Sequence, residues 1–276
     1  MSEIKYTKRK QEVSAVLAIE RRNQILERLQ TCKRVVVSEL SRDFDVSEET
    51  IRRDLEKLEK EGYATKTYGG AVIKEGNGAE LPFVVRKNTN VTGKQQIARL
   101  IGAMIRDGDQ IMLDASSTAV FVAQNIKSKK NITVITNSVE VLIELADVSG
   151  WKILSTGGTM KEGSLAFVGH QAEKMLSTFH VGKAIVSCKG LDAVRGLTDV
   201  SESFAQLKKT MLESATKGIL AVDSSKFDKI SFTEIGKISD VSMIVTDREP
   251  DERWKQVFSA AGVTCVYPGM SWQTEA

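Results

Sequence analysis

Hydroxyl, carboxyl and guanidinium groups gather in residues 47–53, whose sequence is SEETIRR. An Arg side chain can hold guanine O6 and N7 with two hydrogen bonds, and a Ser or Thr hydroxyl can bond a phosphate or touch a thymine methyl group. Such groups reach base edges from the N-terminal end of a helix that enters the major groove of DNA. The residues that we expect on this surface are Ser38, Ser47, Glu49, Thr50, Arg52, Arg53 and Lys57, with Lys66 and Tyr68 on a following hairpin.

Short helices and one hairpin must position this surface. Ile51, Leu55 and Leu58 follow steps of four and three along one stripe, which predicts a helix that Ser47 caps and Gly62 ends. A helix-turn-helix followed by a hairpin is a winged helix. The predicted elements around it are a helix over 19–30, an extended lead-in over 35–37, a helix over 38–44 capped by Ser38, the turn 45–46, and wing strands over 63–67 and 71–74.

A less specific interpretation is an ordinary charged helix whose Arg residues pair with Glu49 or Glu56. The net charge helps little, because the chain carries only +3 and residues 47–61 hold more acids than bases. The order of helix, helix, turn, Ser-capped helix and hairpin favours the DNA-reading interpretation.

A second set of polar residues follows strand-like apolar runs farther along the chain. Asp114-Ala115-Ser116-Ser117-Thr118 joins one such run to a helical pattern. Backbone N–H groups, hydroxyls and a helix N-terminus hold anions at such a junction, beyond the carboxyl ends of parallel strands. A single junction is more typical of a cap or turn, but several in one domain favour a shared phosphate site. The residues that we expect there are Asp114, Ser116, Ser117, Thr118, Thr136, Asn137, Ser138, Gly157, Gly158, Asp223 and Lys226.

Apolar strands alternate with helical patterns after residue 94, which predicts an α/β domain with a mainly parallel sheet. The 276 residues suffice for two domains, the first a small α+β winged helix-turn-helix. The predicted parts are a leader over 1–20, the winged helix over 21–75, a linker and lead-in over 76–93, and an effector-sensing and oligomerisation domain over 94–276. In the last, we expect strands over 110–114, 132–136, 152–155, 183–187, 218–222, 241–245 and 264–267, and helices over 94–105, 118–126, 139–145, 204–215 and 252–261.

The cellular setting follows from what the sequence lacks. It has no run of about 18 apolar residues and no secretory signal pattern, so we expect no membrane span. Cys32, Cys188 and Cys265 are an odd, widely spaced set, which favours a reducing cytoplasm. No His, Cys or carboxylate set has metal-ligand spacing, so we expect neither a metal site nor a cofactor.

Several motifs resemble one known family. The pattern of Arg21, Ile25 and Leu29, the run TIRRDL over 50–55, and YGGA over 68–71 are similar to the DNA-binding domain of DeoR-family bacterial regulators. The resemblance extends through further motifs to residue 247. These are LDASST over 113–118, VITNS over 134–138, STGGT over 155–159, KGLD over 189–192, AVDSSKF over 221–227 and IVTD over 244–247.

The resemblance implies a repressor of a sugar-metabolism operon that binds double-stranded operator DNA. Because helix-turn-helix proteins typically pair two half-sites through a symmetric dimer, we expect a dimer or tetramer. The resemblance also implies a second domain similar in fold to ribose-5-phosphate isomerase and glucosamine-6-phosphate deaminase, with a phosphorylated sugar as effector and Lys189 and Asp192 at the site. Lys189 stands where Gly is commoner in the family, and Phe204 and Gln206 stand where acidic residues are frequent. All three fall near the expected site.

Two other classes of function compete with this one. A sugar-phosphate isomerase or deaminase would share the second fold, but it needs a positioned base, and His170 and His180 lie in no recognisable motif. We therefore expect no catalytic residues. An architectural DNA-binding protein has no need of a sensor domain more than twice the size of its DNA module.

Overall fold

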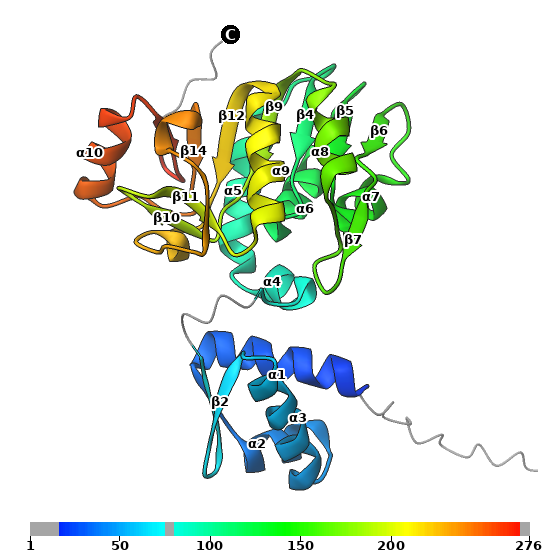
Figure 1. Ribbon diagram of the computed structural model, residues 1–276, viewed down its shortest axis with the longest axis vertical. Helices are drawn as coiled ribbons and strands as arrows, with labels where there is room; N and C mark the ends of the chain where they lie inside the picture. Colours follow the sequence, from blue (N-terminus) through cyan, green and yellow to red (C-terminus); the bar gives the residue numbers. More distant parts are fainter. Residues whose placement is uncertain (1–16, 75–79, 271–276) are drawn as a thin grey trace, which may run out of the picture. The chain divides into compact units, whose positions relative to one another are not determined.

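The computed structural model describes residues 17–74 and 80–270, and the chain divides into two compact units, Met1–Asn77 and Gly78–Ala276 (Figure 1). Most of the predicted leader and the first four residues of the predicted linker, 76–79, lie outside the described residues.

The first unit contains a three-stranded antiparallel sheet in the order β1-β3-β2, packed against helices. This is the predicted winged helix, with β2 and β3 as its wing. Its helices are α1 (Ala18–Cys32), α2 (Val37–Phe44) and α3 (Glu48–Lys60), and its strands are β1 (Arg34–Val36), β2 (Ala64–Thr67) and β3 (Gly70–Ile73).

The local signals at α3 agree with the structure. The Ser47 hydroxyl accepts a hydrogen bond from the Thr50 N–H, and Gly62 follows the helix with φ of 82°. The prediction that Ser38 caps α2 is wrong, because the N-cap is Val36 and Ser38 already lies inside the helix. The first N–H of the helix, on Val37, is instead bonded to the carbonyl of Gly69 on the wing, at 2.8 Å.

A small core and one glycine hold the wing against the helices. Side chains of all three helices are buried there, among them Ile25, Leu40 and Leu55. Gly70 lies so close to β1 that a Cβ atom would stand 1.9 Å from the carbonyl oxygen of Val35. The second Gly of YGGA is therefore required by the β1–β3 pairing.

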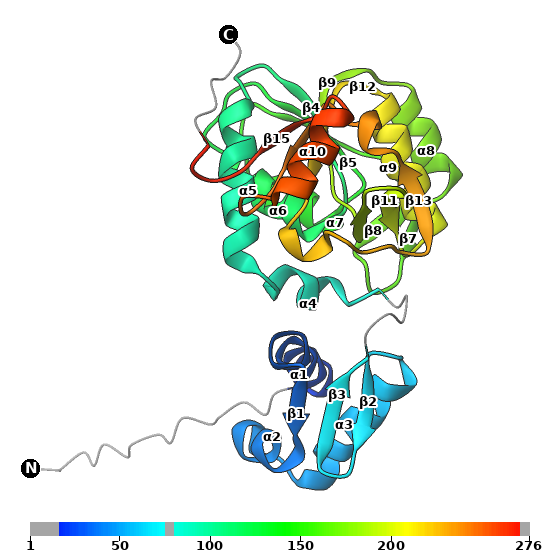
Figure 2. The same ribbon diagram turned by 90° about the vertical axis from the view of Figure 1, so that its left-hand side faces the viewer.

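The second unit is built on a seven-stranded, all-parallel sheet in the order β15-β14-β12-β9-β4-β5-β6 (Figures 1 and 2). The predicted fold class is therefore confirmed. The strands are β4 (Gln110–Leu113), β5 (Thr133–Thr136), β6 (Lys152–Ser155), β9 (Val181–Val186), β12 (Ala215–Ala221), β14 (Met243–Val245) and β15 (Thr264–Val266).

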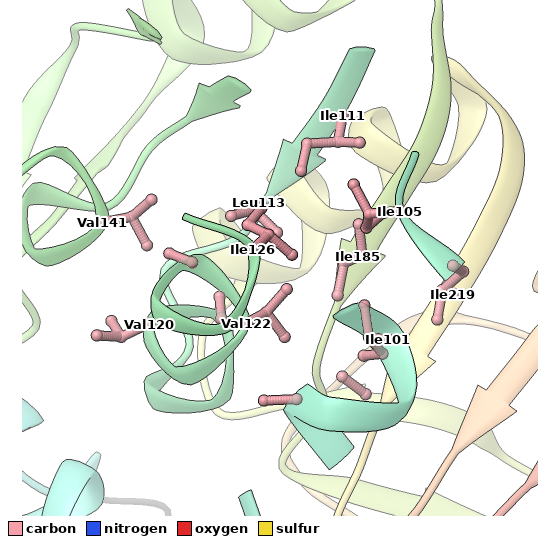
Figure 3. Packing of buried hydrophobic residues seen from close by; sticks show 14 of the residues in the cluster. Ile101, Ile105, Ile111, Leu113, Val120, Val122, Ile126, Val141, Ile185 and Ile219 are labelled. Carbon is pink, nitrogen blue, oxygen red and sulfur yellow. The ribbon is translucent and has the colours of Figure 1, made fainter. Parts of the chain in front are cut away.

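Helices cover both faces of this sheet. Alternate residues of each strand face opposite sides, and since both sets are apolar, both faces must be buried. On β4, Ile111 and Leu113 join one core and Met112 joins the other. Figure 3 shows the first core, with strand residues facing those of α5 and α6. The helices are α5 (Val91–Met104), α6 (Ser117–Ile126) and α7 (Val139–Leu145) on the first face, and α8 (His170–Ser177), α9 (Glu202–Glu213) and α10 (Glu252–Ala260) on the second.

Several short elements were not expected from the sequence. They form a second small antiparallel sheet, a hairpin, one short helix inside the predicted lead-in, and α8; in addition, α5 begins at Val91 instead of residue 94. The small sheet contains β10 (Gly190–Asp192), β11 (Gly196–Asp199) and β13 (Thr233–Gly236), the hairpin β7 (Thr159–Lys161) and β8 (Ala166–Val168), and the short helix is α4 (Phe83–Asn88).

Candidate nucleic-acid interface and ligand site

The N-terminal end of α3 presents polar groups to solvent. Ser47 and Glu49 are exposed and Thr50 is half-buried, with the hydroxyls of Ser47 and Thr50 2.9 Å apart. The capping bond holds the backbone of this end in place. Its free N–H groups and the positive end of the helix dipole favour a phosphate at this position.

Arg52 and Arg53 lie on the exposed face of α3, with side chains 50% and 76% exposed. Each pairs one turn back, Arg52 with Glu48 at 2.6 Å and Arg53 with Glu49 at 3.4 Å. The less specific interpretation expected Arg residues to pair with Glu49 or Glu56. Arg53 does pair with Glu49, whereas Arg52 pairs with Glu48. Exposed pairs of this kind are weak, so they do not prevent either guanidinium from turning to a base edge.

The wing is fastened to α3 by two contacts from Lys66. Its ammonium pairs with Glu56 at 2.8 Å and its backbone N–H donates to Glu59 Oε1 at 2.8 Å. These contacts leave the wing-tip residue Tyr68 fully exposed. Ser38 and Lys57 are also exposed, on α2 and α3.

Asp54 has a role that the sequence did not reveal. It is buried on α3, and its carboxylate accepts from Arg21 Nε at 2.6 Å and lies 3.5 Å from Arg22 Nη1. This ion pair fastens α3 to α1. The available signal was an acid standing on the apolar stripe, three residues after Ile51.

The candidate ligand residues follow β4, β5, β6, β9 and β12, so these loops lie at the carboxyl edge of the parallel sheet. The chain proceeds from β4 through β5 to β6 and then places β9 on the other side of β4. The β4/β9 neighbourhood is therefore the switch point where ligands collect in such sheets.

Asp114 bridges this switch point. Its buried carboxylate accepts from the Ser116 N–H at 3.0 Å and from the Ser187 N–H, beyond β9, at 2.9 Å. Ser116 caps α6 by accepting from the Ala119 N–H. The two following residues, Ser117 and Thr118, are buried in the first turn of α6.

The Thr136–Ser138 junction is also buried. Thr136 Oγ1 donates to the Leu113 carbonyl at 2.7 Å, and Ser138 caps α7. Asn137 Nδ2 donates to the Phe167 carbonyl, but Asn137 Oδ1 has no hydrogen-bond partner within residues 17–74 and 80–270. A buried unpaired acceptor is costly, and a ligand hydroxyl would satisfy it.

Two further parts of the predicted site differ in their surroundings. Gly157 and Gly158 both have positive φ, and a Cβ on Gly158 would stand 2.7 Å from the Val168 carbonyl oxygen. Asp192 instead belongs to the β10–β11 turn, where bonds from the Arg195 and Val194 N–H groups lower the pKa of its carboxyl. Its carboxylate is occupied by the turn.

Asp223 and Lys226 lie in the loop after β12. Burial raises the pKa of Asp223, but Lys226 and bonds from Ser225 outweigh it and the net pKa is lowered. On the neighbouring α5, burial lowers the pKa of Lys94 to about 8, against the attraction of Asp223. Ser116, Ser138 and Asp223 thus make the cap and turn hydrogen bonds of the simpler interpretation. The cations Lys94 and Lys226, which a phosphate site needs, also act on Asp223.

A buried charge network that the sequence did not indicate lies next to these loops. Lys208 on α9 contacts Asp199 at 2.5 Å and Asp114 at 3.6 Å. Lys189 pairs with Glu80 at 3.1 Å. Burial and the charge of Arg86 lower the pKa of Lys189 to about 7, against the attraction of Glu80 and Asp199.

The two positions on α9 that depart from the family pattern have different surroundings. Phe204 is buried against Ala115 and Ala166, with the Lys161 ammonium 4.8 Å from its ring centroid. It thus packs on the loop that carries Ser116. Gln206 is exposed on the same helix.

A winged helix whose α3 has an exposed polar N-terminal end, followed in one chain by a parallel α/β domain, is the architecture of a two-domain DNA-binding regulator. Two family models match, a DeoR-like helix-turn-helix domain over residues 21–76 and a DeoR C terminal sensor domain over 89–248. The chain belongs to the DeoR family of transcriptional regulators.

Curated relatives agree with this assignment. The HTH-type transcriptional regulator YulB of Bacillus subtilis is 44% identical, covering 84% of this chain and 90% of its own length. The transcriptional repressor AccR of Agrobacterium fabrum is 34% identical, covering 83% and 89%. The L-fucose operon activator of Haemophilus influenzae is 36% identical, covering 79% and 88%.

Solved structures are more distant. Ribose 5-phosphate isomerase A of Methanocaldococcus jannaschii has a TM-score of 0.36 and 15% identity, covering 49% of this chain and 53% of its own. That likeness is too weak to carry an argument.

The enzyme alternative finds no support in the family, whose members named above are regulators. His170 and His180 are both exposed on the surface. His180 precedes β9 and therefore lies at the edge of the sheet opposite the candidate site. Within the described residues, no helix is long and apolar enough to cross a membrane.

Proposed function

We propose that this protein is a cytoplasmic repressor of a sugar-metabolism operon. Residues Ser47–Arg53 of α3 read double-stranded operator DNA in the major groove, and the wing contacts the backbone or minor groove beside it. A phosphorylated sugar at the carboxyl edge of the parallel sheet relieves repression. The observation that carries the proposal is the exposed reading end of α3, joined in one chain to a sheet whose switch point gathers buried polar loops.

The chemistry of the loops supports a phosphorylated sugar. Lys189, Arg86 and Lys226 supply positive charge, and the N-terminal turn of α6 supplies N–H groups to a phosphate. Asn137 Oδ1 is positioned to accept from a sugar hydroxyl. The name of one relative, the L-fucose operon activator, fits operon control in this family, and the name of another is that of a transcriptional repressor.

The proposed regulator acts as a homo-oligomer, either dimer or tetramer. Helix-turn-helix proteins pair two operator half-sites through a symmetric dimer, and the second domain is the larger surface for pairing. The sugar can weaken DNA binding only by favouring an arrangement of the oligomer that does not fit both half-sites.

Arg52→Ala and Arg53→Ala test the reading helix. Each is expected to weaken specific binding by about 1–3 kcal/mol per lost base contact. The measurement is an anisotropy titration, at fixed salt, with a duplex from the promoter region beside the protein's own gene. Lys60→Ala, on the last turn of the same helix, is the matched control and should change affinity little. Unchanged affinity in both Arg variants would remove α3 as the reader.

The pKa of Lys189, lowered to about 7, predicts how effector binding depends on pH. A bound phosphate favours the charged ammonium, so affinity should fall as pH rises from about 6.5 to about 8.5 and Lys189 loses its proton. Glu80, Arg86, Asp199 and Lys208 are the charges that act on this group. Calorimetry of a stabilising sugar phosphate across this range measures the effect. In Lys189→Met the slope should disappear, and an equal slope in both proteins would contradict the assignment.

A further inference from the structure

The carboxylate of Glu80 is held by three parts of the second unit. Its Oε1 lies 3.1 Å from Lys189 Nζ and 3.3 Å from Arg86 Nη2 on α4. Its Oε2 accepts from Ser164 Oγ, in the β7–β8 turn, at 2.9 Å. The Glu80 side chain is only 13% exposed. Burial raises the pKa of Glu80, but Lys189 and Arg86 outweigh it, so the net pKa is lowered and the group is an anion at neutral pH.

This anion stands beside the candidate effector site. Lys189 follows β9, and its charge interacts with those of Asp199 and Lys208. Lys208 in turn contacts Asp114, which bridges the switch point of the sheet. Charged groups therefore continue from the switch point to Glu80 without leaving the second unit.

One of the two cations around Glu80 is incompletely satisfied. Arg86 Nη2 is buried, and in the described part of the chain it donates no well-directed hydrogen bond despite its nearness to Glu80. A carboxylate offers two oxygens and a single negative charge. A phosphate monoester offers three acceptor oxygens and nearly two charges, so it would bind the same cations more strongly.

Glu80 also has a particular place in the sequence. It lies directly after residues 75–79, through which the second unit is joined to the DNA-binding domain. If the contacts of Glu80 change, the chain is therefore affected at the start of the effector domain, next to the segment that connects it to the DNA-binding domain.

We propose that Glu80 is an internal anion that occupies the phosphate position of the effector site, and that the phosphorylated effector displaces it from Lys189 and Arg86. Two anions cannot share these cations without strong repulsion, so the Glu80 contact and effector binding exclude each other. The effector thereby releases the chain where it enters the sensor domain, which supplies the coupling that relief of repression requires. This inference rests on the proposed function and adds its regulation.

Glu80→Gln in the full chain tests the displacement, with inorganic phosphate as the probe. The variant keeps the size of the side chain and removes its charge. The phosphate concentration that gives half-maximal thermal stabilisation should fall about tenfold relative to wild type. Glu162→Gln, which removes an exposed acid from the same β7–β8 region, should leave that concentration unchanged.

Operator binding supplies the second measurement. Without any ligand, Glu80→Gln should bind operator several-fold more weakly than wild type, because it resembles the effector-bound state. Ser164→Ala serves if Glu80→Gln does not fold, since it weakens the hold on Glu80 without changing charge. It should shift both quantities in the same direction by a smaller factor.

The outcomes separate the two proposals. Equal phosphate affinity in wild type and Glu80→Gln would overturn the displacement and leave the sugar-phosphate site standing. Tighter phosphate binding with unchanged operator affinity would overturn the coupling. If neither phosphate nor a panel of sugar phosphates stabilises wild type or variant, the proposed function itself fails.

Discussion

Asp54→Ala is expected to abolish operator binding without touching a DNA-facing residue. Asp54 is 4% exposed, and its partner Arg21 is also buried. Removing one member of a buried ion pair costs about 3–5 kcal/mol, because the remaining charge keeps its desolvation cost and loses compensation. A domain this small has a total stability near the lower end of about 5–15 kcal/mol, so most of it would be lost.

Hydrogen–deuterium exchange on the full chain measures this effect domain by domain. Peptides from α1 and α3 should exchange rapidly in Asp54→Ala, whereas peptides from β4 and β9 keep wild-type protection. Glu49→Ala is the matched control, because the carboxylate of Glu49 is exposed on the same helix. This variant should keep the wild-type protection of α3. Wild-type protection of α3 in Asp54→Ala would mean that the ion pair with Arg21 contributes little to the fold.

The sequence was sufficient for the winged helix because its signals are local. The stripe through Ile51 and Leu55, the Ser47 cap and Gly62 each act within a few residues. The one wrong cap, Ser38, has a non-local cause. The Val37 N–H is satisfied by the Gly69 carbonyl, from a hairpin that lies about thirty residues later and that no capping rule considers.

In the second domain, the sequence predicted the parallel sheet but not the short hairpin or the small antiparallel sheet. Strands such as β4 and β9 are buried on both faces and therefore appear as apolar runs. The hairpin of β7 and β8 has strands of three residues, and Thr159–Lys161 is mostly exposed, so no pattern marks it.

The candidate site divides in the same way. The junctions at Ser116 and Ser138 were found because they follow apolar strands directly. The charges that connect the loops were not found. Lys208 contacts Asp199 and Asp114 because α9 packs over the sheet. The spacing of these three residues in the sequence does not predict this contact.

Lys208→Met is expected to destabilise the effector domain by about 3–5 kcal/mol at neutral pH, since it leaves two buried acids without their shared cation. Asp114 keeps its bonds from Ser116 and Ser187, whereas Asp199 keeps the Val200 N–H as its nearest donor. Met fills a similar volume, so the loss is one of charge and not of packing.

The pH dependence of that loss identifies its cause. In wild type, burial raises the pKa of Asp199, but Lys208 and Lys189 outweigh it, so the net pKa is lowered. The stability that Asp199 contributes is therefore present above its unfolded pKa of about 3.9 and is lost only as pH falls below it. In Lys208→Met the largest attraction is lost, so we expect burial to outweigh Lys189 and the Val200 N–H and to raise the folded pKa of Asp199 above the unfolded value. The folded variant then binds a proton more tightly than the unfolded chain does.

The stability gap between wild type and Lys208→Met should consequently narrow as pH is lowered from about 7 towards about 4, since protonation removes the uncompensated charge of Asp199. Thermal unfolding across this range measures the gap. Lys209→Met, the next residue on α9 and an exposed one, loses the same charge and should show a small gap that does not change with pH. A large gap that stays constant with pH would assign the loss to packing around α9, and the ion pairs of Lys208 would then contribute little to the fold.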